Sequence, residues 1–273
     1  MRVIQPLFNF QYSERDDFAF SDGRLSIQQI DDWGTLPDLE IFSERDRQRI
    51  RSKRKALVAD AADLNGTKED SGLLLMAFRI LAHENKLTPT VKYRLSTDEN
   101  WCSRIDETEM HIKLAGYQYQ TYEPADFPAI DATFMKLRAA EHVSNRLKNA
   151  LFFVYRAFNS YHWSDGVLFY MGALEALFSL DKKGGATKAI CGRSTNLVDD
   201  PNWPRNVIED LYDVRSRITH GRLEAGRRPD DNLKLLAKME ILVKLCLRKL
   251  VTLDAFKHYA TAAARDAFLS QFD

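Results

Sequence analysis

Cysteine is scarce in this sequence. The three cysteines, Cys102, Cys191 and Cys246, lie far apart, and none belongs to a CxxC pair. An odd number of cysteines without close spacing argues against both a disulfide framework and a structural zinc site. We therefore expect three reduced thiols and no bound metal, and the sequence predicts no cofactor.

Long apolar runs are also missing. No stretch approaches the roughly 20 apolar residues that a membrane-spanning helix needs. The first ten residues are soon followed by Glu14, Asp16 and Asp17, so they lack the apolar core of a signal peptide. These features predict a soluble, cytoplasmic protein without a membrane partner.

The chain has no net charge, because 39 basic residues balance 39 acidic ones. This balance excludes an attraction of the whole protein to nucleic acid or membranes, so any nucleic-acid site must be a local patch. The strongest basic cluster comprises Arg47, Arg49, Arg51, Lys53, Arg54 and Lys55. We interpret it as the solvated face of a helix, since few apolar residues interrupt it.

Residues 1–124 carry the pattern of an α+β module, whose function the sequence does not indicate. Apolar residues in 1–30, divided by a turn at Ser21-Asp22-Gly23, predict strands. A helix is predicted over 43–64 with Ser43 as its N-cap, and a buried helix over 70–85. Alternating apolar residues within 88–121 predict two strands around a loop that contains Trp101.

The proline-containing segment 122–128 is the expected domain boundary, and residues 125–273 are expected to form an all-α bundle. Helices are predicted at 129–158, 165–180, 186–192, 204–221, 230–251 and 254–270. Ser164 and Asp165 are the expected caps of the second of these helices. The helix at 230–251 is too apolar for one buried face, so it is central to the bundle or lines a dimer interface.

The most informative stretch is 211–221, Leu-Tyr-Asp-Val-Arg-Ser-Arg-Ile-Thr-His-Gly. Leu211, Val214 and Ile218 form one apolar helix face, and Gly221 is a natural left-handed stop. Beside this face, an arc of roughly 140° holds the polar residues of the stretch. These are Tyr212, Arg215, Ser216, Thr219 and His220.

Two interpretations of this arc remain open. In the first, Arg215 pairs with a nearby carboxylate and His220 caps the carbonyls at the helix end, where the helix dipole favours its charged form. In the second, the arginine and the histidine form a phosphate site. Imidazole then moves protons and guanidinium stabilises charge on a phosphoryl group.

The arginine followed by a histidine-glycine pair, Arg215-Ser-Arg-Ile-Thr-His220-Gly221, resembles the R-x(4–6)-H motif of the HEPN superfamily. The whole 211–221 string and the segment Gly172-Ala-Leu-Glu-Ala-Leu-Phe178 are most similar to its ApeA-like branch. The resemblance covers about residues 128–270. Ser216 follows the arginine where many active members carry asparagine, aspartate or histidine.

The resemblance implies a helical bundle that dimerises, so that two motifs meet in one cleft. Many members are metal-independent endoribonucleases of toxin, abortive-infection or antiphage systems. His220 would then be the acid and base for attack of an RNA 2′-hydroxyl on the adjacent phosphate. Arg215 would stabilise the developing charge. The implied partners are RNA, a second copy of the chain, and an antitoxin or trigger molecule.

Other residues receive supporting roles. Glu175 lies on or beside an apolar helix face and needs a cationic partner. The resemblance makes Arg215 the candidate, because both residues belong to the matching segments. The pair is either purely structural, or Glu175 also orients Arg215 towards a phosphate. Ser216 and Tyr212 are further supporting candidates, and Tyr212 is also a candidate substrate contact. The expected substrate-binding residues are Arg217, Thr219, Arg222, Arg227 and Arg228.

Two other functions stay open at this point. The bundle could be a non-catalytic nucleotide- or RNA-binding or dimerisation module that regulates a partner. Alternatively, the N-terminal module could sense a ligand or phage component, with the helical half as its effector. The intact Arg215 and His220 pair favours catalysis.

Overall fold

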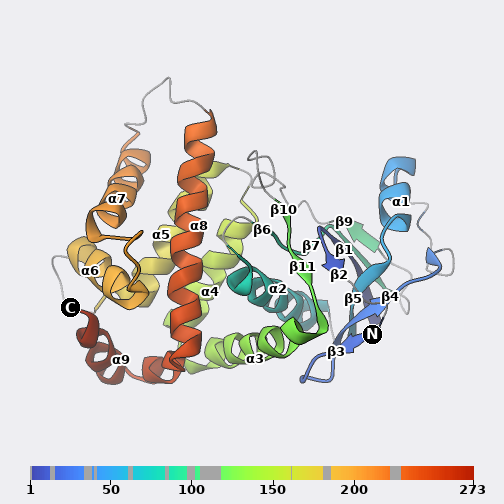
Figure 1. Ribbon diagram of the computed structural model, residues 1–273, viewed down its shortest axis with the longest axis horizontal. Helices are drawn as coiled ribbons and strands as arrows, with labels where there is room; N and C mark the ends of the chain where they lie inside the picture. The colour runs from blue at the N-terminus through green and yellow to red at the C-terminus, as the bar shows by residue number, and fades with distance from the viewer. Residues whose placement is uncertain are drawn as a thin grey trace. The chain divides into compact units, whose positions relative to one another are not determined.

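The computed structural model of the protein describes residues 2–12, 16–33, 39, 42–60, 64–83, 86–96, 102–104, 118–160, 162–180, 186–221 and 229–273. They form two compact units, which divide between Met135 and Lys136. The first unit holds an antiparallel sheet and the second is mostly helical (Figure 1), which confirms the coarse expectation of an α+β part followed by helices. The units divide inside helix α3 (Phe127–Val143). The expected domain boundary near residue 124 stays a prediction.

The helix predicted over 43–64 is wrong in its second half. Helix α1 (Glu44–Arg51) begins as expected, and the Ser43 hydroxyl accepts a hydrogen bond from the Asp46 amide at 3.2 Å. The chain then leaves the helix after Ser52 and forms strand β5 (Lys55–Asp60). A buried run of four apolar residues fits a central strand as well as a helix, so the pattern alone did not separate them.

The main sheet of the first unit has β5 near its centre. Its strands run in the order β3 (Phe18–Ala19), β4 (Leu25–Gln29), β5, β1 (Arg2–Phe8), β8 (Tyr93–Ser96) and β9 (Cys102–Arg104). Neighbouring strands are antiparallel, and β7 (Thr90–Val91) also pairs with β1. The strands expected within 1–30 are therefore present.

Two short parallel pairs lie outside this sheet. Strand β2 (Gln11–Tyr12) pairs with β11 (Thr121–Tyr122), and β6 (Lys86–Leu87) pairs with β10 (Gln118–Tyr119). The alternation within 88–121 thus corresponds to several short strands rather than two. The predicted loop residue Trp101 lies outside the described residues.

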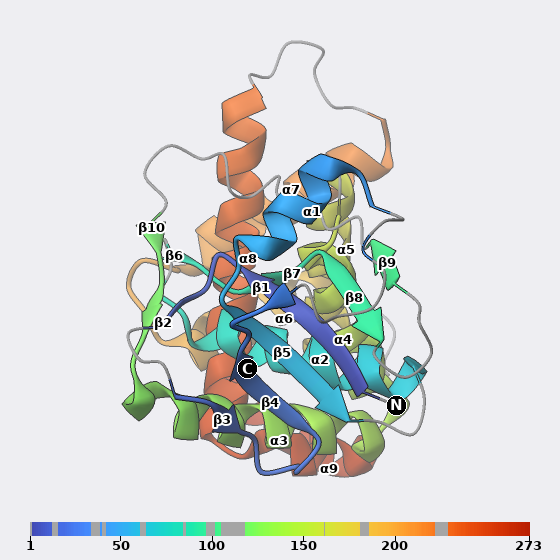
Figure 2. The same cartoon turned by 90° about the vertical axis from the view of Figure 1, so that its right-hand side faces the viewer.

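Each face of the main sheet is covered, because alternate strand residues point to opposite sides. Ile4 and Val58 belong to one buried cluster, which also includes Ile50 of α1. Helix α2 (Leu64–Leu81) packs against β5 (Figure 2), and the buried Gln5 amide donates a hydrogen bond to the Ser71 hydroxyl at 2.7 Å. The expectation of a buried helix in this region is confirmed.

The second unit follows the end of α3 with further helices. They are α4 (Asn145–Phe158), α5 (Trp163–Phe178), α6 (Ala186–Val198), α7 (Arg205–Thr219), α8 (Pro229–Thr252) and α9 (Ala262–Leu269). Helix α8 packs on α5 and α6 (Figure 1), with Met239, Leu242 and Leu247 inaccessible to solvent. It is central to the bundle, as expected. Among the described residues, no helix is both long and apolar enough to cross a membrane.

The single helix predicted over 129–158 is wrong, because the chain breaks it at Ser144. The backbone of Ser144 is extended, and its hydroxyl accepts a hydrogen bond from the Leu147 amide at 3.3 Å. Serine competes with the helix for its own backbone groups and therefore favours a cap. This cap separates α3 from α4.

The helix predicted over 254–270 is also wrong as a single element. A 3-10 helix, η5 (Ala255–Ala260), follows Asp254 in the left-handed region at φ +50°. Thr261 then caps α9, since its hydroxyl accepts a hydrogen bond from the Ala264 amide at 3.2 Å. A last 3-10 turn, η6 (Ser270–Phe272), follows.

Two further helices differ from expectation at their ends. Helix α5 begins two residues early, with His162 rather than Ser164 or Asp165 at its N-cap position. Helix α6 extends six residues beyond the short helix predicted over 186–192. Helix ends are the least certain part of any pattern-based prediction, because local caps compete over a few residues.

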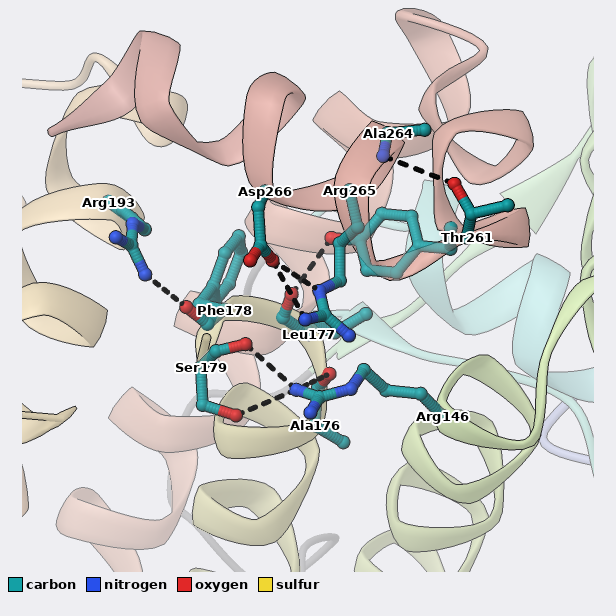
Figure 3. Close-up of polar contacts among 11 residues, drawn as sticks. Arg146, Ala176, Leu177, Phe178, Ser179, Arg193, Thr261, Ala264, Arg265 and Asp266 are labelled. Carbon is teal, nitrogen blue, oxygen red and sulfur yellow. Dashed lines mark hydrogen bonds and ion pairs between the residues drawn. The ribbon is translucent and has the colours of Figure 1, made fainter. Parts of the chain in front are cut away.

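The C-terminal end of α5 is held by three side chains from other elements. The last carbonyls of a helix have no partner within it and must be satisfied elsewhere. Arg146 of α4 donates to the Ser179 carbonyl at 2.8 Å, Tyr259 of η5 to the Leu177 carbonyl at 2.9 Å, and Arg193 of α6 to the Phe178 carbonyl at 2.7 Å (Figure 3). These bonds fix α5 against three neighbouring elements.

We expect Arg193→Ala to lower the free energy of unfolding by about 2–3 kcal/mol, since hydrogen bonds to charged groups contribute roughly 1.5–3 kcal/mol each. Arg193 is 3% exposed, and its Nε also lies 2.7 Å from the Asp273 carboxylate. Urea unfolding followed by far-ultraviolet circular dichroism measures the change.

The matched control is Arg205→Ala, which removes an exposed arginine paired with Glu209 within α7. Exposed ion pairs contribute less than about 1 kcal/mol. Equal losses in both variants would contradict a special role for the buried arginine.

Candidate functional site

Helix α7 carries the motif predicted from the sequence. Leu211 and Val214 are buried, and Ile218 continues the same face with partial exposure. After Thr219 the chain leaves the helix at His220, which has φ −93°, and Gly221 then adopts φ +65°. The expected left-handed glycine is confirmed, and it ends the helix just after the histidine.

Arg215 of α7 and Glu175 of α5 form an ion pair across the two helices. The distance between Arg215 Nη2 and Glu175 Oε1 is 3.1 Å, and the side chains are 40% and 37% exposed. The expected contact is therefore confirmed. Glu175 is not deeply buried, however, so the cost of burying a lone carboxylate does not explain the pairing. Its role in orienting the arginine stays a prediction.

The exposed side of α7 carries the other polar residues of the motif. Ser216, Thr219 and His220 are all exposed. The Thr219 hydroxyl donates a hydrogen bond to the Arg215 carbonyl at 2.9 Å. Arg217 pairs with Asp213 one turn earlier, at 3.0 Å. His220 is thus available to a ligand, whereas the Thr219 and Arg217 side chains already have partners.

A cavity of about 420 Å³ lies between α4 and α5, on the side where Glu175 is exposed. It is lined by Arg146, Asn149, Phe153, Gly172, Glu175, Ala176 and Ser179. A Cβ atom added at Gly172 would lie 3.3 Å from the Phe153 ring, so the glycine lets the two helices approach closely. Glu175 therefore belongs both to the ion pair and to the wall of this cavity.

Sequence reasoning missed Asn149 and Phe153 as neighbours of the site. The single long helix predicted over 129–158 gave no reason to place either residue beside Glu175. The serine cap at Ser144, which sets where α4 begins, is the signal that could have suggested the correct division. Arg146 was missed for the same reason.

Tyr212 lies in the core of the helical unit rather than in the exposed arc. It is 4% exposed, and its hydroxyl has no hydrogen-bond partner among the described residues. Burial, and secondarily the negative charge of Glu175, raise the pKa of the Tyr212 phenol well above its usual value near 10. Its burial argues against the substrate contact that the sequence suggested, and its supporting role stays a prediction.

The two cysteines of this unit are packing residues. Cys191 and Cys246 are free and inaccessible to solvent. Burial raises the pKa of Cys191 to about 11 and that of Cys246 to about 12. Thiols with such pKa values carry almost no thiolate at neutral pH, so neither residue is a nucleophile.

Only some of the arginines predicted at the site lie among the described residues. Arg215 and Arg217 are placed on α7, whereas Arg222, Arg227 and Arg228 lie outside the described residues. Within the described ranges, no three His, Cys, Asp or Glu side chains gather as metal ligands. Arg215 on α7, Glu175 on α5 and His220 at the C-cap of α7 supply a guanidinium, a carboxylate and an imidazole.

Comparison with known proteins adds nothing to this geometry. No family model, curated protein or solved structure matches the chain.

We expect Tyr212→Phe to make the protein more resistant to alkali. An unfolded tyrosine ionises near pH 10 and the folded one at higher pH, so unfolding releases a proton and stability falls as pH rises above about 10. Phenylalanine does not ionise, so the variant lacks this loss of stability at high pH. Urea unfolding at pH 8 and at pH 11 should show a smaller loss in Tyr212→Phe than in the wild type.

The neutral-pH data provide the control for this variant. Removing a buried hydroxyl without a partner should leave stability unchanged or raise it by up to about 1 kcal/mol. A loss of more than about 1 kcal/mol at pH 8 would instead indicate a hydrogen bond of the phenol.

Proposed function

We propose that the protein is a metal-independent endoribonuclease of the HEPN type, in which Arg215 and His220 act on RNA. The observation that carries the proposal is the half-exposed guanidinium of Arg215. It is held from one side by Glu175, at the end of the helix where His220 is exposed. A cation and a titratable imidazole within one helical turn and a half suit chemistry on a phosphate.

The reaction is a transfer of the phosphoryl group within the RNA strand. His220 takes the proton of a ribose 2′-hydroxyl, and the resulting oxygen attacks the adjacent phosphorus. Arg215 stabilises the negative charge that develops on the phosphoryl oxygens. The bond between phosphorus and the 5′-oxygen breaks, and the imidazolium of His220 returns the proton to that oxygen. The products are a 2′,3′-cyclic phosphate and a 5′-hydroxyl.

Glu175 serves as a positioning residue in this scheme. Arginine has five N–H donors, and the contact with Glu175 uses Nη2. The carboxylate fixes the guanidinium in one orientation while other donors remain for a phosphate. The cavity beside Glu175, with Asn149 and Phe153 in its wall, offers room for the ribose or base next to that phosphate.

Two copies of the chain combine in the proposed enzyme. The helical unit exposes Phe152, which is 54% accessible, next to the Phe153 and Phe169 rings, whose centroids lie 6.3 Å apart. Exposed aromatic residues are enriched where proteins associate. A second copy on this surface would border the cavity that contains Glu175. Under this proposal the protein serves as a toxin or antiphage effector, controlled by an antitoxin or trigger.

We expect the purified protein to cleave mixed cellular RNA in the presence of EDTA. His220→Ala should lower the rate by about 10²–10⁴-fold, the usual contribution of a general acid or base. Arg215→Ala should lower it by about 10²-fold or more, because it removes charge stabilisation from the transition state. Gel electrophoresis of the RNA over time measures the rates.

Two surface substitutions are matched controls. Arg205→Ala removes an exposed, ion-paired arginine from the same helix, and His142→Ala removes an exposed histidine from α3. Both should cleave like the wild type.

Glu175→Gln should lower the rate less than Arg215→Ala. Equal cleavage by wild type, His220→Ala and Arg215→Ala would refute the assigned site, and RNA binding without cleavage would favour a regulatory module.

The proposed dimer leads to a separate expectation. Light scattering coupled to size-exclusion chromatography should give twice the 31.5 kDa chain mass. Phe152→Ser should shift the protein towards the monomer, because it removes the largest exposed apolar side chain of this surface. Leu253→Ser, at another exposed apolar residue of the helical unit, is the control. A monomeric wild type would contradict the dimer.

A further inference from the structure

The first unit contains a cavity of about 530 Å³ that the proposed nuclease does not use. It is lined by Leu7, Phe10, Gln11, Tyr12, Gln29, Ser52, Lys53, Arg54, Lys55 and Thr121. The turn between α1 and β5 supplies the basic residues, and the strand pair β2–β11 supplies the opposite wall. Its volume lies in the range of small-molecule sites.

Lys53 and Arg54 both line this cavity, and neither has a carboxylate partner among the described residues. Lys53 is half-buried, with Nζ 4.9 Å from the centre of the Phe8 ring. Burial, and secondarily the charge of Arg49, lower the pKa of Lys53. Arg54 is exposed, and its backbone carbonyl accepts a hydrogen bond from Ile30 at 2.9 Å. The turn is therefore anchored through its backbone while the guanidinium remains available.

The ammonium group of Lys55 already has polar partners within the unit. Its Nζ donates to the Asp16 carbonyl at 2.9 Å and lies 4.0 Å from the Asp17 carboxylate. It also lies 5.3 Å from the centre of the Tyr12 ring. Lys55 thus holds the wall in place. Because the Lys53 ammonium lies over the Phe8 ring, which does not line the cavity, the positive charge left for a ligand is that of Arg54.

The opposite wall is aromatic. Phe10 and Tyr12 are half-buried and line the cavity. The Phe10 ring is stacked on Tyr122 with centroids 5.6 Å apart, and the Tyr12 ring meets Phe127 edge-on at 5.1 Å. These contacts fix both rings from behind, so they provide a rigid apolar surface against which a flat ring can pack.

We propose that this cavity binds a small anion that carries a flat ring, namely a nucleotide or a ligand of the same chemistry. Arg54 holds the phosphate groups, and the Phe10 and Tyr12 wall packs against the ring. Gln11, Gln29 and Thr121 supply polar groups around it. The site is separate from Arg215 and does not depend on the nuclease assignment.

The test is isothermal titration of the full chain with three probes: ADP, inorganic pyrophosphate and adenosine. ADP should bind more tightly than either fragment, because only ADP uses both the Arg54 guanidinium and the aromatic wall. Arg54→Gln should weaken ADP binding by about tenfold or more, since it removes the charged donor to phosphate.

Two controls separate this site from other charges. Arg51→Gln removes an exposed arginine three residues from Arg54 that does not line the cavity, and it should leave ADP binding unchanged. Arg205→Ala, at an exposed arginine of α7 paired with Glu209, should also bind ADP like the wild type. Circular dichroism verifies that each variant is folded.

Three results would overturn the proposal. The first is the absence of binding by all three probes at about 1 mM, which corresponds to an affinity too weak for a built site. The second is equal weakening by Arg51→Gln and Arg54→Gln, which would indicate diffuse charge rather than a cavity. The third is pyrophosphate binding as tightly as ADP, which would exclude a role for the aromatic wall.

Discussion

The helical unit depends on how the C-terminal carbonyls of α5 are satisfied. Arg146 and Arg193 reach these carbonyls from α4 and α6, as Figure 3 shows, and Tyr259 reaches another from η5. Unpaired backbone carbonyls are costly in a core, so the three side chains hold neighbouring elements to one helix end. Glu175 lies one turn before this end. Its position, and through it that of Arg215, follows from the same bonds.

The chain is neutral overall, but its cations are used in different ways. The arginines at the end of α5 are structural, and Arg205 and Arg217 pair within their own helix. Arg215 instead pairs across helices and stays half-exposed, while His220 follows it at the helix end. Local placement rather than total charge therefore determines where a phosphate can bind, as the composition suggested.

Sequence patterns predicted what depends on periodicity and local caps. The apolar face of α7 and the stop at Gly221 were predicted from residues 211–221. Arg215 was instead predicted as the partner of Glu175 because both lie in the segments that resemble the HEPN superfamily. The patterns failed where a short segment could take two structures. The apolar run that forms β5 was predicted as the second half of a helix over 43–64. Ser144 was not identified as a helix cap, so α3 and α4 were predicted as one helix. The burial of Tyr212 also escaped prediction, because a tyrosine beside an apolar stripe can turn either way. Tertiary packing decides such cases.

The chemical ends of the cleaved RNA test the central claim most directly. Attack by the 2′-hydroxyl predicts fragments with a 5′-hydroxyl and a 2′,3′-cyclic phosphate or its 3′-phosphate product, formed in EDTA and lost in His220→Ala. An RNA with a 2′-deoxy residue at the cleaved position should remain intact there. Fragments with a 5′-phosphate, or cleavage of the deoxy-substituted position, would contradict the account.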